Sequence, residues 1–301
     1  MTIANNSFSQ LFEGINIQGG GLGVSNSVIQ DVVVFGNTFS QMTSTGTSAV
    51  EVGAGPTNDV TQRVQIVQNT FTDNFQGLVI AIGGASSGNL VQDVTVARNA
   101  FTGNLQALGV VAGVNSGSNN NTVMNTEIVD NLINLMGYEG QGSGTIQIID
   151  SQSGGTNDKV TAVSLVNNTI YNGTSSDPPG WGVWVTSSGG VSGVNIWNTV
   201  FWGNESNPPL KGITSCAQVS YSIIDQSGFS GVNNNINSDP LFVNLSGGDF
   251  HLQSGSPARH AGTVAGAPAI DLDCQPRGSP PSIGAYEFDA PISAPRLTAR
   301  R

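Results

Sequence analysis

The chain has few charged residues: Asp, Glu, Lys and Arg together make up only 10% of its 301 residues, with two lysines, two histidines and two cysteines. Helix-forming residues are scarce, and no run of about eighteen apolar residues occurs, so the sequence predicts neither amphipathic helices nor a membrane span. The net charge of -11, with no Lys/Arg cluster before the last few residues, argues against nucleic acid as a partner. Two histidines cannot build a His-rich metal site, and no nucleotide, zinc or nucleophile-elbow motif is present.

The first twenty residues also lack the charged and apolar regions of a signal peptide. Met1 is followed at once by the segment from Ile3 to Phe8, which matches the middle of a repeat unit described below. We therefore expect a truncated or trimmed N-terminus, and the missing signal peptide does not argue against export.

What the chain does contain is glycine, 40 residues of it, together with much Asn, Ser, Thr and Val. This composition is typical of many short strands joined by tight turns.

A repeat of about 31 residues runs through most of the chain. Each copy has an apolar anchor, an Asn three positions later and a large apolar residue five positions later. The anchors are Ile3, Val34, Ile66, Val96, Ile128, Leu165 and Ile196. The third positions are Asn6, Asn37, Asn69, Asn99, Asn131, Asn168 and, in the seventh copy, Thr199. The fifth positions are Phe8, Phe39, Phe71, Phe101, Ile133, Ile170 and Phe201, and a weaker eighth copy has Val219, Ser222 and Ile224.

Such a unit cannot bury its apolar face alone, so neighbouring units must stack. A second alternating run in each unit, for example Val50 to Val52 or Val183 to Val185, makes each unit a three-sided coil. The sequence therefore predicts an all-β fold, a right-handed parallel β-helix of about eight rungs over residues 1–237. An irregular capping module follows at 238–289, with a disordered tail at 290–301.

Stacking brings equivalent residues of successive units into columns, so the Asn side chains are expected to form a hydrogen-bonded ladder and the Phe rings a stack. One outward column reads Asp31, Arg63, Asp93, with alternating charges. Arg98 and Asp130 share another column, where we expect an exposed ion pair between rungs.

Beyond residue 238 the period stops. The sequence then contains four motifs in succession, at Asp239-Pro240-Leu241-Phe242, Gly248 to Leu252, Ser254 to Ala258 and Ile283-Gly284-Ala285-Tyr286-Glu287. These motifs resemble the C-terminal module of the bacterial choice-of-anchor Q family, secreted or surface proteins built on pectate-lyase-like β-helices. The strong match covers about 50 residues, and the rungs before it are similar more weakly. The resemblance implies an exported protein of a family that includes surface-attached members, and it implies no particular reaction.

The C-terminal segment is expected to close the last rung, since an open solenoid end exposes unpaired strand edges. Asp271 and Asp273 in it are weak candidates for a Ca²⁺ site, with turn and capping carboxylates as the commoner alternative. Cys216 and Cys274 form either one disulfide or two free thiols. His251 and His260 are interpreted as structural.

The best signal for a binding site is aromatic. All four tryptophans, Trp181, Trp184, Trp197 and Trp202, fall within 22 residues. Trp184 is outward by alternation, and exposed rings pack against sugar faces. We therefore predict carbohydrate contacts from Trp181, Trp184, Tyr138 and Tyr171, with structural packing as the alternative.

Catalysis has weaker support. A glycoside hydrolase on this fold needs two outward carboxylates about 5 to 10 Å apart, and the candidates are Glu127, Glu139, Asp150 and Asp177. Two functions therefore remain open. The preferred one is a secreted or cell-surface β-helix that binds polysaccharide or serves as a surface rod. The other is a polysaccharide lyase or glycoside hydrolase of the pectate-lyase-like superfamily.

Overall fold

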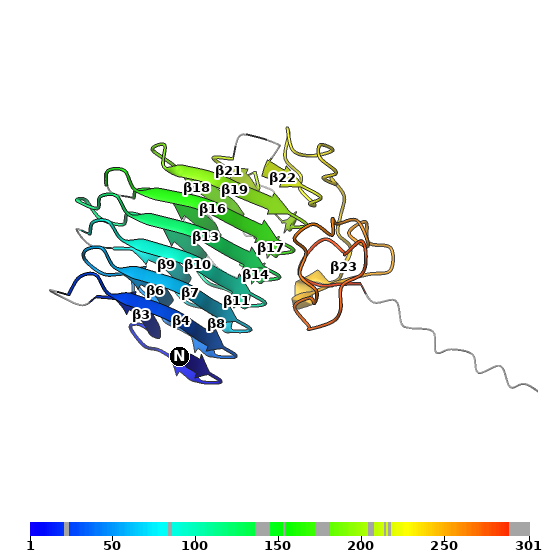
Figure 1. Cartoon of the computed structure of the whole chain (residues 1–301). Helices are drawn as coiled ribbons and strands as arrows, with labels where there is room; N and C mark the ends of the chain where they lie inside the picture. Colours follow the sequence, from blue (N-terminus) through cyan, green and yellow to red (C-terminus); the bar gives the residue numbers. More distant parts are fainter. Residues whose placement is uncertain are drawn as a thin grey trace, which may run out of the picture.

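The protein is a β-solenoid, whose three parallel sheets form the faces of a stack of coils (Figure 1). The structure, a computed structural model, describes residues 1–20, 24–83, 86–135, 145–152, 154–172, 181–203, 208–213, 215 and 218–288. The tail at 290–301 lies outside this range. Among the described residues, no helix has the length and apolar character needed to cross a bilayer.

Each sheet takes one strand from each coil. Sheet A contains β1 (Thr2–Ala4), β4 (Val28–Phe35), β7 (Val60–Val67), β10 (Leu90–Ala97), β13 (Thr122–Val129), β16 (Lys159–Val166), β19 (Val191–Trp197) and β22 (Val219–Ser220). Sheet B contains β2 (Ser7–Ser9), β5 (Thr38–Ser40), β8 (Thr70–Thr72), β11 (Ala100–Thr102), β14 (Leu132–Asn134), β17 (Thr169–Tyr171) and β20 (Val200–Trp202). Sheet C contains β3 (Ile15–Gly19), β6 (Ser48–Ala54), β9 (Gln76–Ile82), β12 (Gln106–Val111), β15 (Ile146–Ile149), β18 (Val183–Thr186) and β21 (Leu210–Lys211).

The register of the strands confirms the repeat. The anchors pair one to the next along sheet A, from Ile3 with Val34 to Ile196 with Val219. Among the described residues seven coils contribute to all three sheets, and an eighth contributes β22 to sheet A, so the stack is slightly shorter than eight full rungs.

The asparagine ladder is confirmed at the bend between sheets A and B. Asn69 donates to Asn99 Oδ1 from its backbone N (2.8 Å) and from Nδ2 (3.1 Å), and Asn99 donates to Asn131 in the same way. Asn69, Asn99 and Asn131 are at most 1% exposed. The ladder thus satisfies buried backbone groups at a bend where the strand hydrogen bonds are interrupted.

A second polar ladder, at the bend between sheets C and A, was not predicted. Asp59 donates its backbone N–H to Asn89 Oδ1, Asn89 donates to Asn121, and Asn121 donates to Asp158 Oδ1. Each of these residues directly precedes a strand of sheet A and stands seven positions before an anchor, but the column changes between Asp and Asn.

The predicted ring stack lies inside the solenoid. The centroid separations along Phe8, Phe39, Phe71 and Phe101 are 5.0, 5.0 and 4.6 Å, with interplanar angles of 10° or less. The continuing column of Ile133, Ile170 and Phe201 is fully or almost fully buried. This column and the inward residues of sheets A and C form one core along the coils.

The alternating charge column is also present on the outer face of sheet A. Arg63 Nε lies 2.7 Å from Asp31 Oδ1, and its NH2 lies 3.0 Å from Asp31 Oδ2. Both side chains are about half exposed, at 46% and 61%.

Because this pair is solvated, Arg63→Gln is expected to lower the free energy of unfolding only slightly. Urea denaturation of the two proteins at low and at high salt checks this. The difference should shrink as salt screens the pair, and a salt-independent loss of several kcal/mol would contradict the surface assignment.

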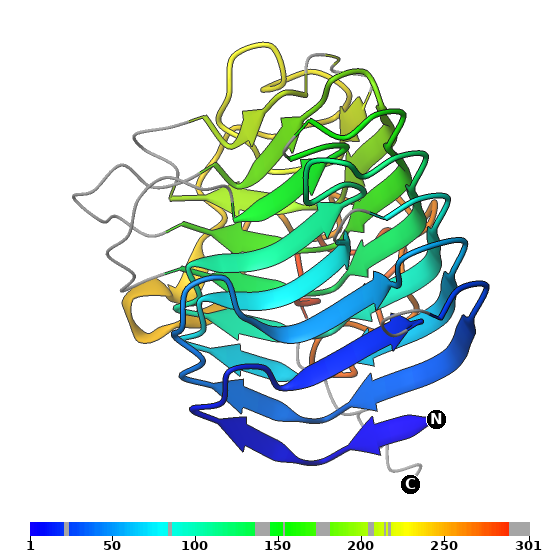
Figure 2. The ribbon, with the colours of Figure 1, turned by 90° about the vertical axis from the view of Figure 1, so that its left-hand side faces the viewer.

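The C-terminal segment does not cap the end of the solenoid, so the predicted position is wrong. Residues 238–288 lie beside the stack, against its flank (Figures 1 and 2). The segment contains an antiparallel pair, β23 (Phe242–Asn244) and β24 (Asp249–Leu252), with a short 3₁₀ turn, η2 (Leu245–Gly247), between them.

The physical reason is that the flank is apolar and the end is already closed. Outward residues of sheet B change from Ser and Thr in the early coils to Leu132, Tyr171, Val200 and Trp202 in the later ones. These four pack with Phe242 and Phe250 of the C-terminal segment in a second apolar cluster. The end of the stack is closed by residues 225–237, where Phe229 is 6% exposed and joins the core.

The C-terminal segment also bonds to a column of bend residues. Each bend places one residue with a left-handed backbone before the ladder position, including Gln68, Arg98, Asp130, Asn167 and Asn198. Asn167 Nδ2 donates to Ser282 O, Asn198 Nδ2 donates to Thr263 O, and Gln68 Nε2 donates to Cys274 Sγ. The segment therefore links several coils laterally.

The expected exposed pair of Arg98 with Asp130 is wrong for the same reason. The C-terminal segment covers Asp130, which is 0% exposed, and Asp130 Oδ1 pairs with Arg277 NH2 at 2.6 Å. Arg277 also reaches Glu287, at 3.5 Å. A column that is outward within the solenoid is thus buried by a distant part of the chain.

Gly284 shows how closely the C-terminal segment approaches. Its φ is +102°, and a Cβ there would lie 2.9 Å from Thr169 Oγ1 and 3.0 Å from a methyl of Val200. Its backbone N donates to Asn198 O, and the N of Ala285 donates to Thr169 Oγ1. The Ile283-Gly284-Ala285 motif is therefore a docking element against the solenoid.

Cys274 lies exposed in this segment and carries a free thiol, so it is not joined in the disulfide considered above. Cys216 lies outside the described residues.

Candidate functional site

The predicted aromatic site lies on the outer face of sheet C. Val183 is fully buried, Trp184 is partly exposed, and Trp184 pairs in register with Gln147 of β15 and Lys211 of β21. Strand alternation thus directs the Trp184 side chain outward, as predicted. Trp181 immediately precedes this strand and is also partly exposed.

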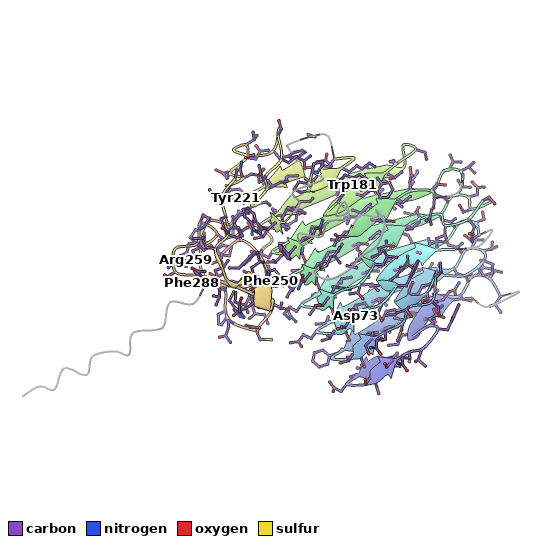
Figure 3. All side chains as sticks on the ribbon, turned by 180° about the vertical axis from the view of Figure 1, so that it is seen from behind. Asp73, Trp181, Tyr221, Phe250, Arg259 and Phe288 are labelled. Carbon is purple, nitrogen blue, oxygen red and sulfur yellow. The ribbon has the colours of Figure 1, made fainter. Side chains whose placement is uncertain are left out.

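The two indoles lie together and hold a lysine. The ring centroids of Trp181 and Trp184 are 5.2 Å apart, and the planes are inclined by 50°. Lys211 Nζ lies 3.6 Å from the Trp181 centroid and 4.6 Å from the Trp184 centroid. Each such cation–π contact contributes about 0.5 to 1 kcal/mol at an exposed site. We call these three side chains the Trp–Lys site; Trp181 is labelled in Figure 3.

Next to this site the outer face of sheet C is uncharged and largely buried, since Val79, Ala81, Val111 and Ile149 are at most 9% exposed and form a small apolar cluster with Val114. From β9 to β18, the outward positions that pair along the column of Trp184 are Val79, Gly109 and Gln147, and the next column contains Ala81, Val111, Ile149 and Thr186. Among the described strand residues of sheet C from β9 onward, Lys211 is the only charged one. The Trp–Lys site therefore stands at one end of an uncharged strip.

Tyr171, the other predicted aromatic residue that the structure describes, does not join this site. Tyr171 is 4% exposed and packs against Phe250, with centroids 5.5 Å apart, beneath the C-terminal segment. Sheet B, which carries Tyr171, faces a different side from sheet C. Tyr138 lies outside the described residues. Trp202 belongs to the covered flank, and Trp197 lies close to Gly266 of the C-terminal segment.

The two candidate acids that the structure describes are not brought together either. Glu127 is exposed on sheet A, whereas Asp150 follows sheet C and is 1% exposed. Asp150 Oδ2 accepts from the backbone N of Gly190 (2.7 Å) and from Ser187 Oγ (2.9 Å). Burial by itself raises the pKa of Asp150, but hydrogen bonds from Gly190 and Ser187, among others, outweigh it and lower the pKa. Asp150 thus acts as an ionised turn-forming group. Glu139 and Asp177 lie outside the described residues.

A shallow groove of about 340 Å³ on sheet A contains the column of Asp31, Arg63 and Asp93. The hydrogen bond from Arg63 lowers the pKa of Asp31 and outweighs the smaller effect of desolvation, so Asp31 is held ionised. It is therefore unsuited to donate a proton at neutral pH.

Sequence reasoning missed Glu51 on the outer face of sheet C. Its pKa is raised, first by burial and then by the charge of Glu13. Glu51 shares the outward column of Trp184, but four strand steps separate them, about 19 Å at the usual spacing of strands. The two residues therefore do not form one site.

The C-terminal segment holds an Asp–His–Asp contact. His251 Nδ1 lies 2.6 Å from Asp249 Oδ1, and its Nε2 lies 2.7 Å from Asp273 Oδ2. Burial lowers the pKa of His251, but the two carboxylates outweigh it and raise the pKa overall. Asp271 accepts the backbone N–H groups of Gln275 and Glu287. These contacts suit a structural role, and no group of three or more His, Cys, Asp or Glu residues in the described ranges could hold a metal ion.

Comparison with protein-family models and with curated proteins finds no match to this chain.

Proposed function

We propose that this protein binds polysaccharide on the outer face of sheet C, with the Trp–Lys site as the main contact. The observation that carries the proposal is the pair of partly exposed indoles, 5.2 Å apart, projecting from a regular strand face. Aromatic rings offer large, rigid contact areas to the apolar faces of sugars. The outward residues of sheet C next to the indoles are buried, so the proposed contact is confined to the Trp–Lys site. The proposal includes a secreted or cell-surface location, where such polymers occur.

Trp184→Ala is expected to weaken glycan binding at least tenfold, because truncating a tryptophan at the centre of a contact surface removes about 1.4 kcal/mol or more. Affinity electrophoresis of the purified protein against a panel of polysaccharides measures this.

Phe12→Ala is the matched control, since Phe12 is 73% exposed in the loop before β3, at the other end of the stack. Both variants should unfold within about 1 kcal/mol of the parent, because neither ring is in the core. Retention of full affinity by Trp184→Ala would contradict the proposal.

The enzyme alternative predicts new unsaturated or reducing ends when the protein is incubated with the same panel. Among the described residues no carboxylate is hydrogen-bonded or ion-paired with the Trp–Lys site. This favours binding over hydrolysis at that site.

A further inference from the structure

Lys211 carries a charge that no ion pair among the described residues neutralises. The described ion pairs involve Arg63, Arg277 and His251, and none includes Lys211. Its side chain is exposed, on a chain with a net charge of -11. Aromatic rings attract an ammonium group but leave its charge intact. Lys211 is thus an available cation, held in place, in an otherwise acidic molecule.

The position of Lys211 also changes what the two indoles can do. Its ammonium lies against ring faces of both Trp181 and Trp184, so those parts of the rings are not free for a flat sugar. An ammonium group has three N–H donors and no acceptor. A ligand that reaches this point must therefore present acceptor oxygens, and charged oxygens form the stronger hydrogen bonds.

We propose that the Trp–Lys site selects anionic polysaccharides, whose carboxylate or sulfate groups accept hydrogen bonds from Lys211 while the sugar rings contact the indoles. This inference rests on the proposed function. The site supplies local attraction, whereas the net charge of the protein repels polyanions elsewhere. Selection of the anionic group is therefore confined to this place on sheet C.

The test compares polymers that differ only in charge. Polygalacturonate is paired with its neutral methyl ester, which tests carboxylate, and dextran sulfate is paired with dextran, which tests sulfate. Affinities are measured by affinity electrophoresis and calorimetry, with a chelator present so that divalent cations cannot bridge the anions. We expect the parent protein to bind at least one anionic polymer tenfold or more tightly than its neutral partner.

Lys211→Gln is expected to remove most of that preference, and Lys211→Arg to keep it. Lys159→Gln is the matched control, because Lys159 is the other lysine of the chain, is exposed on sheet A and changes the net charge equally. Lys159→Gln should bind like the parent protein.

The outcomes separate the two proposals. Two results would overturn the anionic selection and leave the proposed polysaccharide binding intact. The first is that the parent protein binds the charged and neutral polymers of both pairs with equal affinity. The second is that the Lys211→Gln variant loses affinity for neutral and anionic polymers alike. The second result would mean that Lys211 only positions the indoles. Failure of every polymer in this set and in the wider panel to bind would instead overturn the proposed function, and the selection with it.

Discussion

Asn99→Ala is expected to lower the free energy of unfolding by about 3 to 5 kcal/mol. Asn99 is fully buried, and its Oδ1 accepts two hydrogen bonds from Asn69 while its Nδ2 donates to Asn131 and to Ile66 O. Alanine removes these partners together and leaves a buried amide N–H and a buried carbonyl unsatisfied. Water cannot replace them without opening the coil. Equilibrium unfolding in urea, followed by circular dichroism, measures the loss.

Gln62→Ala is the control for this experiment. Gln62 donates to Gln30 (3.0 Å) and accepts from Gln92 (2.7 Å), so it also belongs to an amide ladder between coils. That ladder lies on the outer face of sheet A, where water can replace the lost bonds, and the expected loss is below about 1 kcal/mol. Similar losses for Asn99→Ala and Gln62→Ala would show that burial does not set the strength of the inner ladder.

Arg277→Met is expected to lower the free energy of unfolding by about 3 to 5 kcal/mol at pH 8. The substitution removes the cation paired with the fully buried Asp130, and the hydrogen bonds from Arg277 to the carbonyls of Gly284 and Ala285. Methionine fills a similar volume but leaves Asp130 without a partner. Because Arg277 links the C-terminal segment to the solenoid, that segment should also become more sensitive to limited proteolysis.

The loss should be smaller at pH 5, by about 1 kcal/mol, because Asp130 then carries a proton in both proteins, whereas pH 8 lies only about one unit above the pKa of Asp130 in the parent protein. Burial raises the pKa of Asp130 to about 7, although the charge and hydrogen bond of Arg277 act in the opposite direction. In the unfolded chain the pKa is about 3.9. The folded state therefore binds the extra proton, so the contribution of Asp130 to stability is full below about pH 4. It declines as the pH rises and is lost above about pH 7.

Denaturation of the parent protein and of Arg277→Met at both pH values tests this. Arg63→Gln, which removes a solvated Arg–Asp pair, should have a small effect at both. An equal loss for Arg277→Met at pH 5 and pH 8 would contradict the assignment of a proton to Asp130.

The sequence contained a sign that the C-terminal segment docks on the flank of the solenoid, but this sign lay in the comparison of repeat units and not in any one segment. The outward residues Leu132, Tyr171, Val200 and Trp202 appear in the sequence as apolar exceptions in two columns that are otherwise mostly Ser and Thr, which indicates a covered flank. The same exceptions indicate that Tyr171 packs against another part of the chain and does not contact a ligand. The second ladder was also visible in the repeat, because Asp59, Asn89, Asn121 and Asp158 each stand seven positions before an anchor, but the change between Asp and Asn in this column concealed it.

The candidate site was predicted in part. Strand alternation around Val183 is enough to place Trp184 outward, and the prediction is confirmed. Lys211 was missed because β21 follows a loop of irregular length, and its register with Trp184 is visible only once the strands are paired.

The sequence alone determined the coils, their register, the asparagine ladder between sheets A and B and the ring stack, because a repeat with a period of two within each strand allows only one alignment in which Phe meets Phe and Asn meets Asn. Only the tertiary structure decided where the C-terminal segment docks, which charges are buried and which residues surround the indoles. Those outcomes depend on contacts between residues as far apart in sequence as Asp130 and Arg277, for which no local pattern exists. Their strength is set by the burial that the contact itself creates.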